Sequence, residues 1–600
     1  MRRFVSFLSL FVFAISIVAG TTGSIYGTIS DGNKNLIKGA LVKIAGNAQN
    51  VKSNKKGEYL IIGVSPGIYT LNCQFPGYMP NTISNIEVYI DKTTDLNISM
   101  KKRLGNDDVE IEVYKELSTE STEKSFTTGS SDFNSIIEEN EFKIVTKAPL
   151  STFSIDVDAA SYSNMRRLIN NNQIPRKDAV RIEEMINYFC YDYDFPIEDV
   201  PFAINTEISD CPWNKQNILV HIGLQGKKIE NANTEKSNFV LLLDMSSSMD
   251  SENKLELLKK SFGLLLDALK PTDRIAIVLY AGSEGLVLPS TEVMDKEIIL
   301  NAINNLTANA STTGSEGIAL AYEIAEEYFI ENGNNRIILA TNGDFDIESS
   351  RTSELVEIIE NKIGEGVFLT ILDYGNGHNN YNRIENITNK CHGNYFHIDN
   401  ILEANKVLVT ELTGTMFAIA KDVKLQIEFN PVKVASYRLI GYENRLMDKE
   451  GFNDNNTDAC GIGAGYAVTA LYEIVPAFPE VTKKIDDLKY QLFDTIKPNA
   501  FNSDELMYIK LSYKEPNDNQ STLIEYPLID DGEYFEKTSN NFRFAAAVAE
   551  FGMLLRESKF KGNSTFDGVI EMAKKSKGKD EFGYRSEFIQ LAQKAKLLNK

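Results

Sequence analysis

The stretch Phe239–Ser248, FVLLLDMSSS, decides the fold of the central part of this 600-residue chain. Five consecutive apolar residues precede Asp244, with no polar residue among them. An uninterrupted apolar run of this length is typical of a strand covered on both faces, as strands of parallel sheets are. Leucine and phenylalanine side chains then recur at helical spacing between residues 255 and 269. The stretch therefore predicts the first strand and the first helix of an α/β domain.

The segments that follow repeat this alternation of strand and helix. Further strands are expected at 274–280, 286–288, 336–340 and 367–372, and helices at 298–306, 317–329 and 353–363. Buried strands alternating with amphipathic helices predict a Rossmann-like, doubly wound and mostly parallel sheet. Ligands of such folds bind at the carboxyl ends of the strands, so the polar residues that follow each strand are the candidates for a site.

Three oxygen-bearing side chains follow the first strand on one short loop, namely Asp244, Ser246 and Ser248. A carboxylate and two hydroxyls are ligands that a hard cation such as Mg²⁺ accepts. The same residue types also suit the N-terminal cap of the following helix. This motif alone leaves both interpretations open.

Two later loops are expected at the same edge of the sheet. Thr312, in the sequence STTG at 311–314, precedes a helix, and Asn342, in TNGD at 341–344, follows the strand at 336–340. Because the carboxyl ends of parallel strands meet at one edge, we expect both loops to approach Asp244. The three loops together predict a site for Mg²⁺, or for Mn²⁺ or Ca²⁺.

This order of motifs resembles the metal-ion-dependent adhesion site of von Willebrand factor A domains. The metal ligands that the resemblance implies by motif are Asp244, Ser246, Ser248 and Thr312. It also implies a protein partner whose acidic side chain fills an open coordination position of the metal.

Asn342 departs from the family pattern, which usually has Asp at this position. A neutral amide leaves the site one negative charge short, which weakens the hold on a cation unless Asp344 or Asp346 compensates. Alternatively, the less neutralised metal attracts the partner's carboxylate more strongly. Ser247 also replaces a more common glycine, which is a minor change.

The segments on both sides of the α/β domain have β character. Strand-like runs are expected at 202–208 and 218–224 before it, and at 423–429, 436–440, 467–474 and 507–513 after it. The C-terminal part has helical spacing from Phe544 to Leu555. We therefore expect one β-sandwich that is interrupted in sequence by the α/β domain.

The flanking segments resemble a bacterial subfamily in which an A domain carries its own N-terminal and C-terminal domains. The motifs that carry the resemblance are SIDVD (154–158), RIEEMINYF (181–189), CPWN (211–214), GYENR (441–445) and ALYEI (470–474). The expected boundaries are 150–235 for the N-terminal flanking domain, 236–416 for the A domain and 417–600 for the C-terminal β and helical domain. Trp213, the single tryptophan, is expected to be a packed core residue.

The N-terminal segment 23–101 alternates short β runs with glycine turns. Its motifs GTISD (27–31), GALV (39–42), GEY (57–59) and PGIYTL (66–71) resemble the carboxypeptidase regulatory-like domain. The resemblance implies a transthyretin-like β-sandwich without catalytic residues of its own. The Ser, Thr, Glu and Lys-rich segment 102–149 is expected to be a flexible linker.

Residues 1–20 have the order of a secretory signal peptide, with Arg2 and Arg3 before an apolar run and small residues at Ala19 and Gly20. The alternative is an uncleaved membrane anchor, for which the run is short. Because no cysteine lies near the expected cleavage site, a lipid anchor is not expected. No later stretch is long and apolar enough to predict a membrane span. The mature protein is expected in the periplasm, at the cell surface or secreted.

Composition and motifs favour a binding protein over an enzyme. A net charge of −22 disfavours nucleic acid as a partner. The chain contains no HExxH, GxSxG or P-loop motif. Five scattered cysteines predict no disulfide scaffold, although a Cys190–Cys211 bridge stays open. The alternatives to metal-dependent protein binding are a scaffold with a degenerate metal site and a metal-dependent hydrolase.

Overall fold

The computed structural model describes residues 22–45, 50–89, 92–103, 138–155, 157, 159–197, 200–228, 236–251, 253–279, 285–308, 315–331, 333–342, 366–374, 394–411, 418–448, 452, 462–477, 496–516, 518 and 520–599. The expected signal peptide, residues 104–137 of the expected linker and the helix expected at 353–363 lie outside these ranges. The chain divides into two compact units, residues 1–114 with 577–600 and residues 115–576.

The first unit is a small β-sandwich joined by the C-terminal helix. Its sheets have the orders β4-β1-β7, with β8 also pairing with β1, and β3-β2-β5-β6. The strands are β1 (Gly23–Asp31), β2 (Leu41–Ile44), β3 (Asn50–Lys52), β4 (Glu58–Val64), β5 (Gly67–Gln74), β6 (Asn81–Val88), β7 (Thr93–Asp95) and β8 (Ile98–Met100). Buried aliphatic residues from both sheets form its core. The β-sandwich expected for residues 23–101 is therefore present.

Helix α13 (Tyr584–Leu598) packs against β4 in this unit, which the sequence did not predict. Gln590 makes two hydrogen bonds to the sandwich: its Oε1 accepts from the Gly63 amide at 3.0 Å, and its Nε2 donates to the Thr22 carbonyl at 3.1 Å. The last helix of the chain is thus part of the N-terminal unit.

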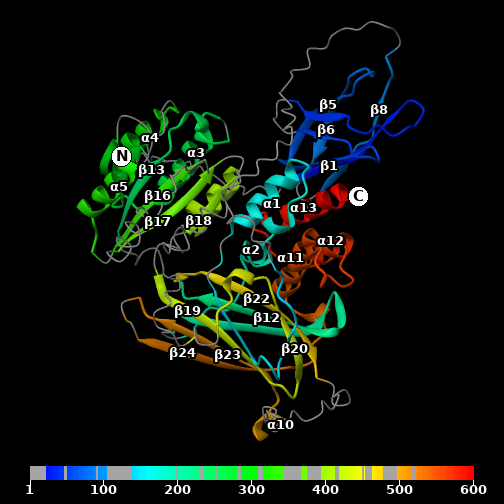
Figure 1. Ribbon diagram of the computed structural model, residues 1–600. Coiled ribbons are helices and arrows are strands. Elements are labelled where there is room, and N and C mark those ends of the chain that lie inside the picture. The colour runs from blue at the N-terminus through cyan, green and yellow to red at the C-terminus, as the bar shows by residue number, and fades with distance from the viewer. Residues whose placement is uncertain are drawn as a thin grey trace, which may run out of the picture. The chain divides into compact units, whose positions relative to one another are not determined.

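The second unit contains the α/β domain, whose sheet has the order β15-β14-β13-β16-β17-β18 (Figure 1). Its strands are β13 (Ser237–Leu243), β14 (Arg274–Leu279), β15 (Leu286–Glu292), β16 (Asn334–Thr341), β17 (Val367–Tyr374) and β18 (Asn394–Ile398). All neighbours are parallel except β14 and β15, which are antiparallel. The predicted doubly wound, mostly parallel sheet is confirmed, with one further strand, β18.

Helices cover both faces of this sheet. One face packs on α3 (Leu255–Ala268) and α4 (Lys296–Asn304), and the other packs on α5 (Ser315–Glu327). The central strands β13 and β16 are buried along their whole length. An apolar run without alternation is the pattern that such two-sided burial requires.

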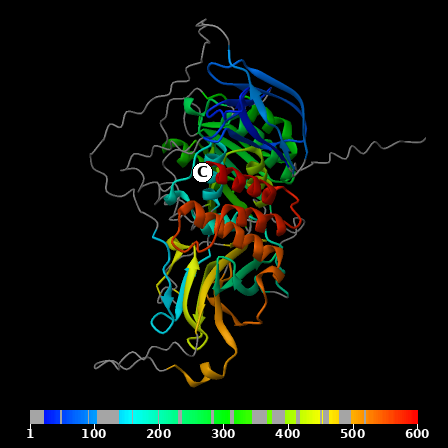
Figure 2. The ribbon, with the colours of Figure 1, turned by 90° about the vertical axis from the view of Figure 1, so that its right-hand side faces the viewer.

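Two five-stranded sheets form the second β-sandwich, with the orders β10-β19-β23-β24 and β11-β12-β22-β20-β9, and with β21 pairing with β19. The strands before the α/β domain are β9 (Lys143–Ile144), β10 (Leu150–Ser154), β11 (Phe202–Cys211) and β12 (Asn214–Gly226). Those after it are β19 (Ala418–Phe429), β20 (Val434–Ile440), β21 (Ile462–Gly463), β22 (Ala467–Pro476), β23 (Glu505–Lys514) and β24 (Ser521–Ile529). Strands from before the α/β domain, coloured cyan and green, therefore lie beside strands from after it, coloured yellow and orange (Figure 2).

The topology confirms that the α/β domain is inserted in the sandwich. β10 pairs with β19, and β12 pairs with β22, so each sheet combines strands from both sides of the insertion. One buried apolar core joins the two sheets.

Helices complete this unit. They are α1 (Ala160–Asn170), α2 (Ile182–Asn187), α11 (Asn540–Arg556) and α12 (Phe566–Lys575). Trp213 is buried, as expected. Cys190 is exposed and Cys211 is buried, and both are thiols, so the bridge left open by the sequence is not formed. Among the described residues, no helix has the length and apolarity needed to cross a membrane.

Candidate metal centre

The candidate site lies where the strand order of the α/β sheet reverses. The chain runs from β13 outward to β14 and β15, and then returns to the other side of β13 as β16. Ligands of open α/β sheets bind beside the carboxyl ends of the strands at such a switch point. Leu243 of β13 lies opposite Ala340 of β16, so Asp244 and the residues after Ala340 share this edge.

The loop after β13 is fixed by backbone and side-chain hydrogen bonds. The Asp244 amide continues the ladder by donating to the Ala340 carbonyl at 2.9 Å. The Asp244 carboxylate accepts from the Ser246 amide at 2.9 Å, which is the local turn that Asp favours. The two hydroxyls of Ser246 and Ser248 are 2.8 Å apart. All three side chains thus gather on one turn.

Asn342, which directly follows the neighbouring strand β16, reaches the same turn. Its Nδ2 donates to the Ser248 hydroxyl at 2.5 Å. Asp244, Ser246 and Asn342 are buried, whereas Ser248 is exposed. Four of the five predicted site residues are therefore together at one edge of the sheet, with Ser248 on the solvent side. Thr312, Asp344 and Asp346 lie outside the described residues.

The alternative that these residues cap a helix is wrong for the following helix. Helix α3 begins at Leu255, and its cap residue, Lys254, makes no capping hydrogen bond with its side chain. Ser246 stands at the cap of a short 3₁₀ turn, Ser247–Met249, and it also makes no side-chain capping bond. The hydroxyls of Ser246 and Ser248 instead bond to each other and to Asn342.

Lys254 is a charged neighbour of this turn that the sequence did not predict. Its Nζ donates to the Ser248 carbonyl at 2.7 Å. An ammonium beside the loop opposes a second cation there. Its position ten residues after Asp244 at the start of a helix carries no recognisable signal in the sequence.

The donor set suits a hard cation. It consists of one carboxylate, two hydroxyls and one amide, which agrees with the preference of Mg²⁺ for oxygen and for only one or two carboxylates. The orientation of an amide is assigned from its hydrogen bonds, and rotation of Asn342 by half a turn would direct its oxygen toward Ser248. Thr341, the preceding residue, has a fully buried hydroxyl for which the described part of the chain provides no hydrogen-bond partner. No group of three His, Cys, Asp or Glu side chains that could hold a metal exists within the described ranges.

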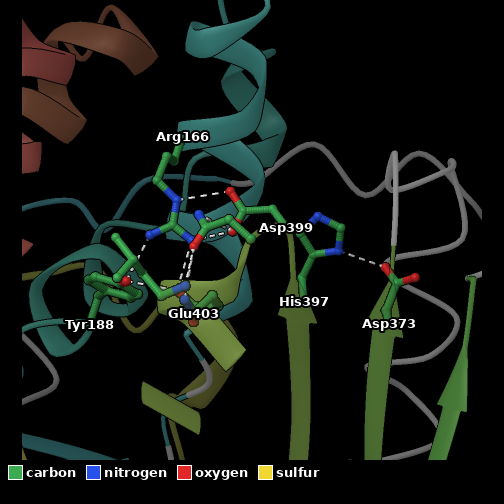
Figure 3. A network of polar contacts seen from close by, with 8 residues as sticks. Arg166, Tyr188, Asp373, His397, Asp399 and Glu403 are labelled. Carbon is green, nitrogen blue, oxygen red and sulfur yellow. Dashed lines mark hydrogen bonds and ion pairs between the residues drawn. The ribbon is translucent and has the colours of Figure 1, made fainter. Parts of the chain in front are cut away.

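A second polar pair lies on the next two strands. Asp373 of β17 lies opposite Thr341, and its Oδ2 is 2.9 Å from Nδ1 of His397 in β18 (Figure 3). The Tyr395 hydroxyl donates to the same oxygen at 3.2 Å. Asp373, like Asp244, stands at the end of an apolar run, so the sequence contained a signal for a polar site residue there. His397 lies in a strand that was not predicted.

Comparison with known proteins defines the class of the chain. Residues 239–344 match the family described as "von Willebrand factor type A domain", and residues 127–221 match one described as "von Willebrand factor". Residues 24–101 match the "Carboxypeptidase regulatory-like domain". The protein is thus a von Willebrand factor A domain protein with flanking domains, preceded by a carboxypeptidase regulatory-like domain, as the sequence predicted.

A longer match gives the family within that class. The chain is 39% identical over 465 residues to "Uncharacterized protein YfbK" of Escherichia coli (strain K12), covering 76% of this chain and 80% of that protein. Residues 414–598 also match the family described as "Uncharacterized protein YfbK, C-terminal". The chain belongs to the YfbK family.

More distant similarities concern parts of the chain. Human inter-alpha-trypsin inhibitor heavy chain H3 is 27% identical over 164 residues, which are 26% of this chain and 18% of that protein. Among solved structures, a von Willebrand factor type A protein from Catenulispora acidiphila is 15% identical, with 65% of this chain and 89% of that chain covered and a TM-score of 0.35. BatB from Bacteroides thetaiotaomicron is 21% identical, with 29% and 97% covered and a TM-score of 0.25.

Proposed function

We propose that this protein binds another protein through a divalent cation at the carboxyl ends of β13 and β16. The proposed ligands are Asp244, Ser246, Ser248, Thr312 and Asn342. An acidic side chain of the partner would occupy the remaining coordination position. The observation that carries the proposal is the mutual hydrogen bonding of Ser246, Ser248 and Asn342 around the Asp244 turn.

The class of protein and the site agree with binding rather than catalysis. A von Willebrand factor A domain is a protein-interaction module, and the exposed Ser248 gives a partner access to the turn. The ligand set itself contains no general base beyond Asp244, which would be engaged by the metal. The expected signal peptide at 1–20 would direct this binding to the periplasm, the cell surface or the medium.

Titration calorimetry of Mg²⁺ and Mn²⁺ into the full chain tests the proposal. We expect saturable binding by the parent, none by Asp244→Ala, and parental binding by Ser247→Ala. Ser247 is the matched control because it lies on the same turn, is exposed and is not a proposed ligand. Asn342→Asp adds a negative charge at the site and is expected to bind the cation about tenfold more tightly.

A scaffold role with a degenerate site is the second candidate, and two observations favour it. Asn342 supplies no charge, and the Lys254 ammonium lies on the loop itself. Absence of binding by the parent together with binding by Asn342→Asp would support this role. Absence of binding by both would contradict a metal centre at this position.

A further inference from the structure

Helix α1, which lies outside the α/β domain in sequence, inserts Arg166 beside the last strand of that domain (Figure 3). Arg166 is only 1% exposed. Its Nε donates to Asp399 Oδ2 at 2.9 Å, and its Nη2 donates to Asp399 Oδ1 and, at 2.8 Å, to Glu403 Oε2. Its Nη1 donates to the Tyr188 hydroxyl at 2.8 Å. The contact between the flanking helices and the α/β domain is therefore ionic at this point.

The pKa of Glu403 is lowered although its side chain is buried. Burial alone would raise the pKa of Glu403, but Arg166, Lys406 and the hydrogen bonds from Arg166 and Tyr188 outweigh it and hold the pKa below its ordinary value. Lys406 Nζ also lies 4.3 Å from the centre of the Tyr188 ring. Buried ion pairs add little net stability because desolvation offsets their attraction, but they are directional, and removal of one partner leaves an uncompensated charge.

A short series of contacts leads from Asp399 to the candidate metal centre. Asp399 directly follows β18, which contains His397. His397 bonds to Asp373 of β17. Asp373 lies opposite Thr341 of β16, and Asn342 is the next residue. Arg166 thus holds the end of the outermost strand, and the two strands beside it lead inward to a proposed ligand.

We infer that Arg166 is a positioning residue for the metal centre, which rests on the proposed function. Its bonds to Asp399 and Glu403 hold the corner between β18 and helix α8 (Ile401–Asn405) in one orientation. Without Arg166, the buried Glu403 and the part-buried Asp399 lose a positive charge that they share, and the corner has to open to water or shift. The His397–Asp373 bond transmits that shift to the edge that carries Asn342.

The test compares Mg²⁺ affinity in the full chain and in Arg166→Met by titration calorimetry. We expect Arg166→Met to bind Mg²⁺ about tenfold more weakly, within the usual range of coupling between sites. The matched control is Arg438→Met. Arg438 is also buried and donates to Glu473 at 2.8 Å, but it lies in the β-sandwich. Both variants should unfold at lower temperature than the parent, and the control should keep parental Mg²⁺ affinity.

Parental affinity in a folded Arg166→Met protein would overturn the inference, and so would an equal loss of affinity in Arg438→Met. If circular dichroism shows that Arg166→Met does not fold, Asp399→Asn replaces it under the same criterion, because it removes the charge and keeps the side chain's size. A parent chain that binds no Mg²⁺ overturns the proposed function itself. That failure is distinct, since it appears before any variant is compared.

Discussion

The electrostatic balance of the candidate site is decided by a few side chains. Asp244 brings one negative charge, Asn342 brings none, and Lys254 places an ammonium on the carbonyl of Ser248. Two unit charges about 4 Å apart interact by about 1 kcal/mol in water and by more near a protein surface. The positive charge of Lys254 therefore weakens cation binding in the same direction as the missing carboxylate does.

Lys254→Gln is expected to raise the affinity for Mg²⁺ about threefold to tenfold, because it removes this repulsion and keeps a hydrogen-bond donor. The gain should shrink as ionic strength rises, since the side chain is partly exposed and salt screens such charges. Calorimetry at low and high salt measures both effects. Lys260→Gln is the control, because Lys260 is exposed on helix α3, which begins directly after Lys254. An equal gain in this variant would show that the effect comes from net charge and not from the position of Lys254.

At the scale of elements, the motifs at 181–189 and 441–445 meet in the second unit. Arg556 of α11 donates to Glu443 of the second motif at 2.6 Å and to the carbonyl of Val180, the residue before the first motif, at 2.5 Å. Gly441 allows the close approach. It has φ of +76°, and a Cβ there would lie 2.7 Å from the backbone nitrogen of Glu183 in α2. The two motifs thus pack directly against each other.

Gly441→Ala is expected to lower the free energy of unfolding of the sandwich by about 2 kcal/mol more than Gly465→Ala does. Gly465 has φ of +74°, and apart from its two chain neighbours no residue that the structure describes has a heavy atom within 4 Å of the place that a Cβ would take. This variant therefore measures the cost of backbone strain alone, roughly 1–2 kcal/mol. Urea unfolding followed by the fluorescence of Trp213 measures the difference, because this single tryptophan is buried in the same unit. Equal losses in the two variants would show that the contact with Glu183 is unimportant.

At the scale of the whole molecule, the inserted α/β domain separates strands that must pair. β12 and β22 are bonded over eight residue pairs from Ile218↔Ile474 to Gln225↔Ala467, although more than 230 positions separate them. The shared core of both sheets should hold the flanking segments together without a continuous chain.

Site-specific protease sites inserted at 120, 232 and 415 test this arrangement. After cleavage, fragments 121–232 and 416–600 are expected to elute together on size exclusion, because separating them would expose the common apolar core. The cut at 120 removes the covalent link between the N-terminal unit and fragment 121–232. Mass spectrometry of the eluted peak identifies the fragments, and separate elution of 121–232 would refute the shared sandwich.

The sequence alone determined the α/β domain, its insertion between β segments, and four residues of the candidate site that the structure brings together. These features can be predicted because they are local or periodic in the sequence. An uninterrupted apolar run indicates a strand that is buried on both faces, and a polar residue directly after it indicates the carboxyl end of that strand. Expected residues such as Thr312, and the domain boundaries, stay predictions.

Only the tertiary structure decided the neighbours of that site and the junctions between segments. Lys254 is close to Ser248 in sequence, but no spacing pattern indicates that its ammonium reaches the Ser248 carbonyl. The His397–Asp373 pair and the contacts of Arg166 join side chains that are distant in sequence. The packing of α13 on β4 is of the same kind. Periodicity identifies which face of an element is buried, but the partner that buries it is chosen by the complementarity of shape and charge in the folded chain.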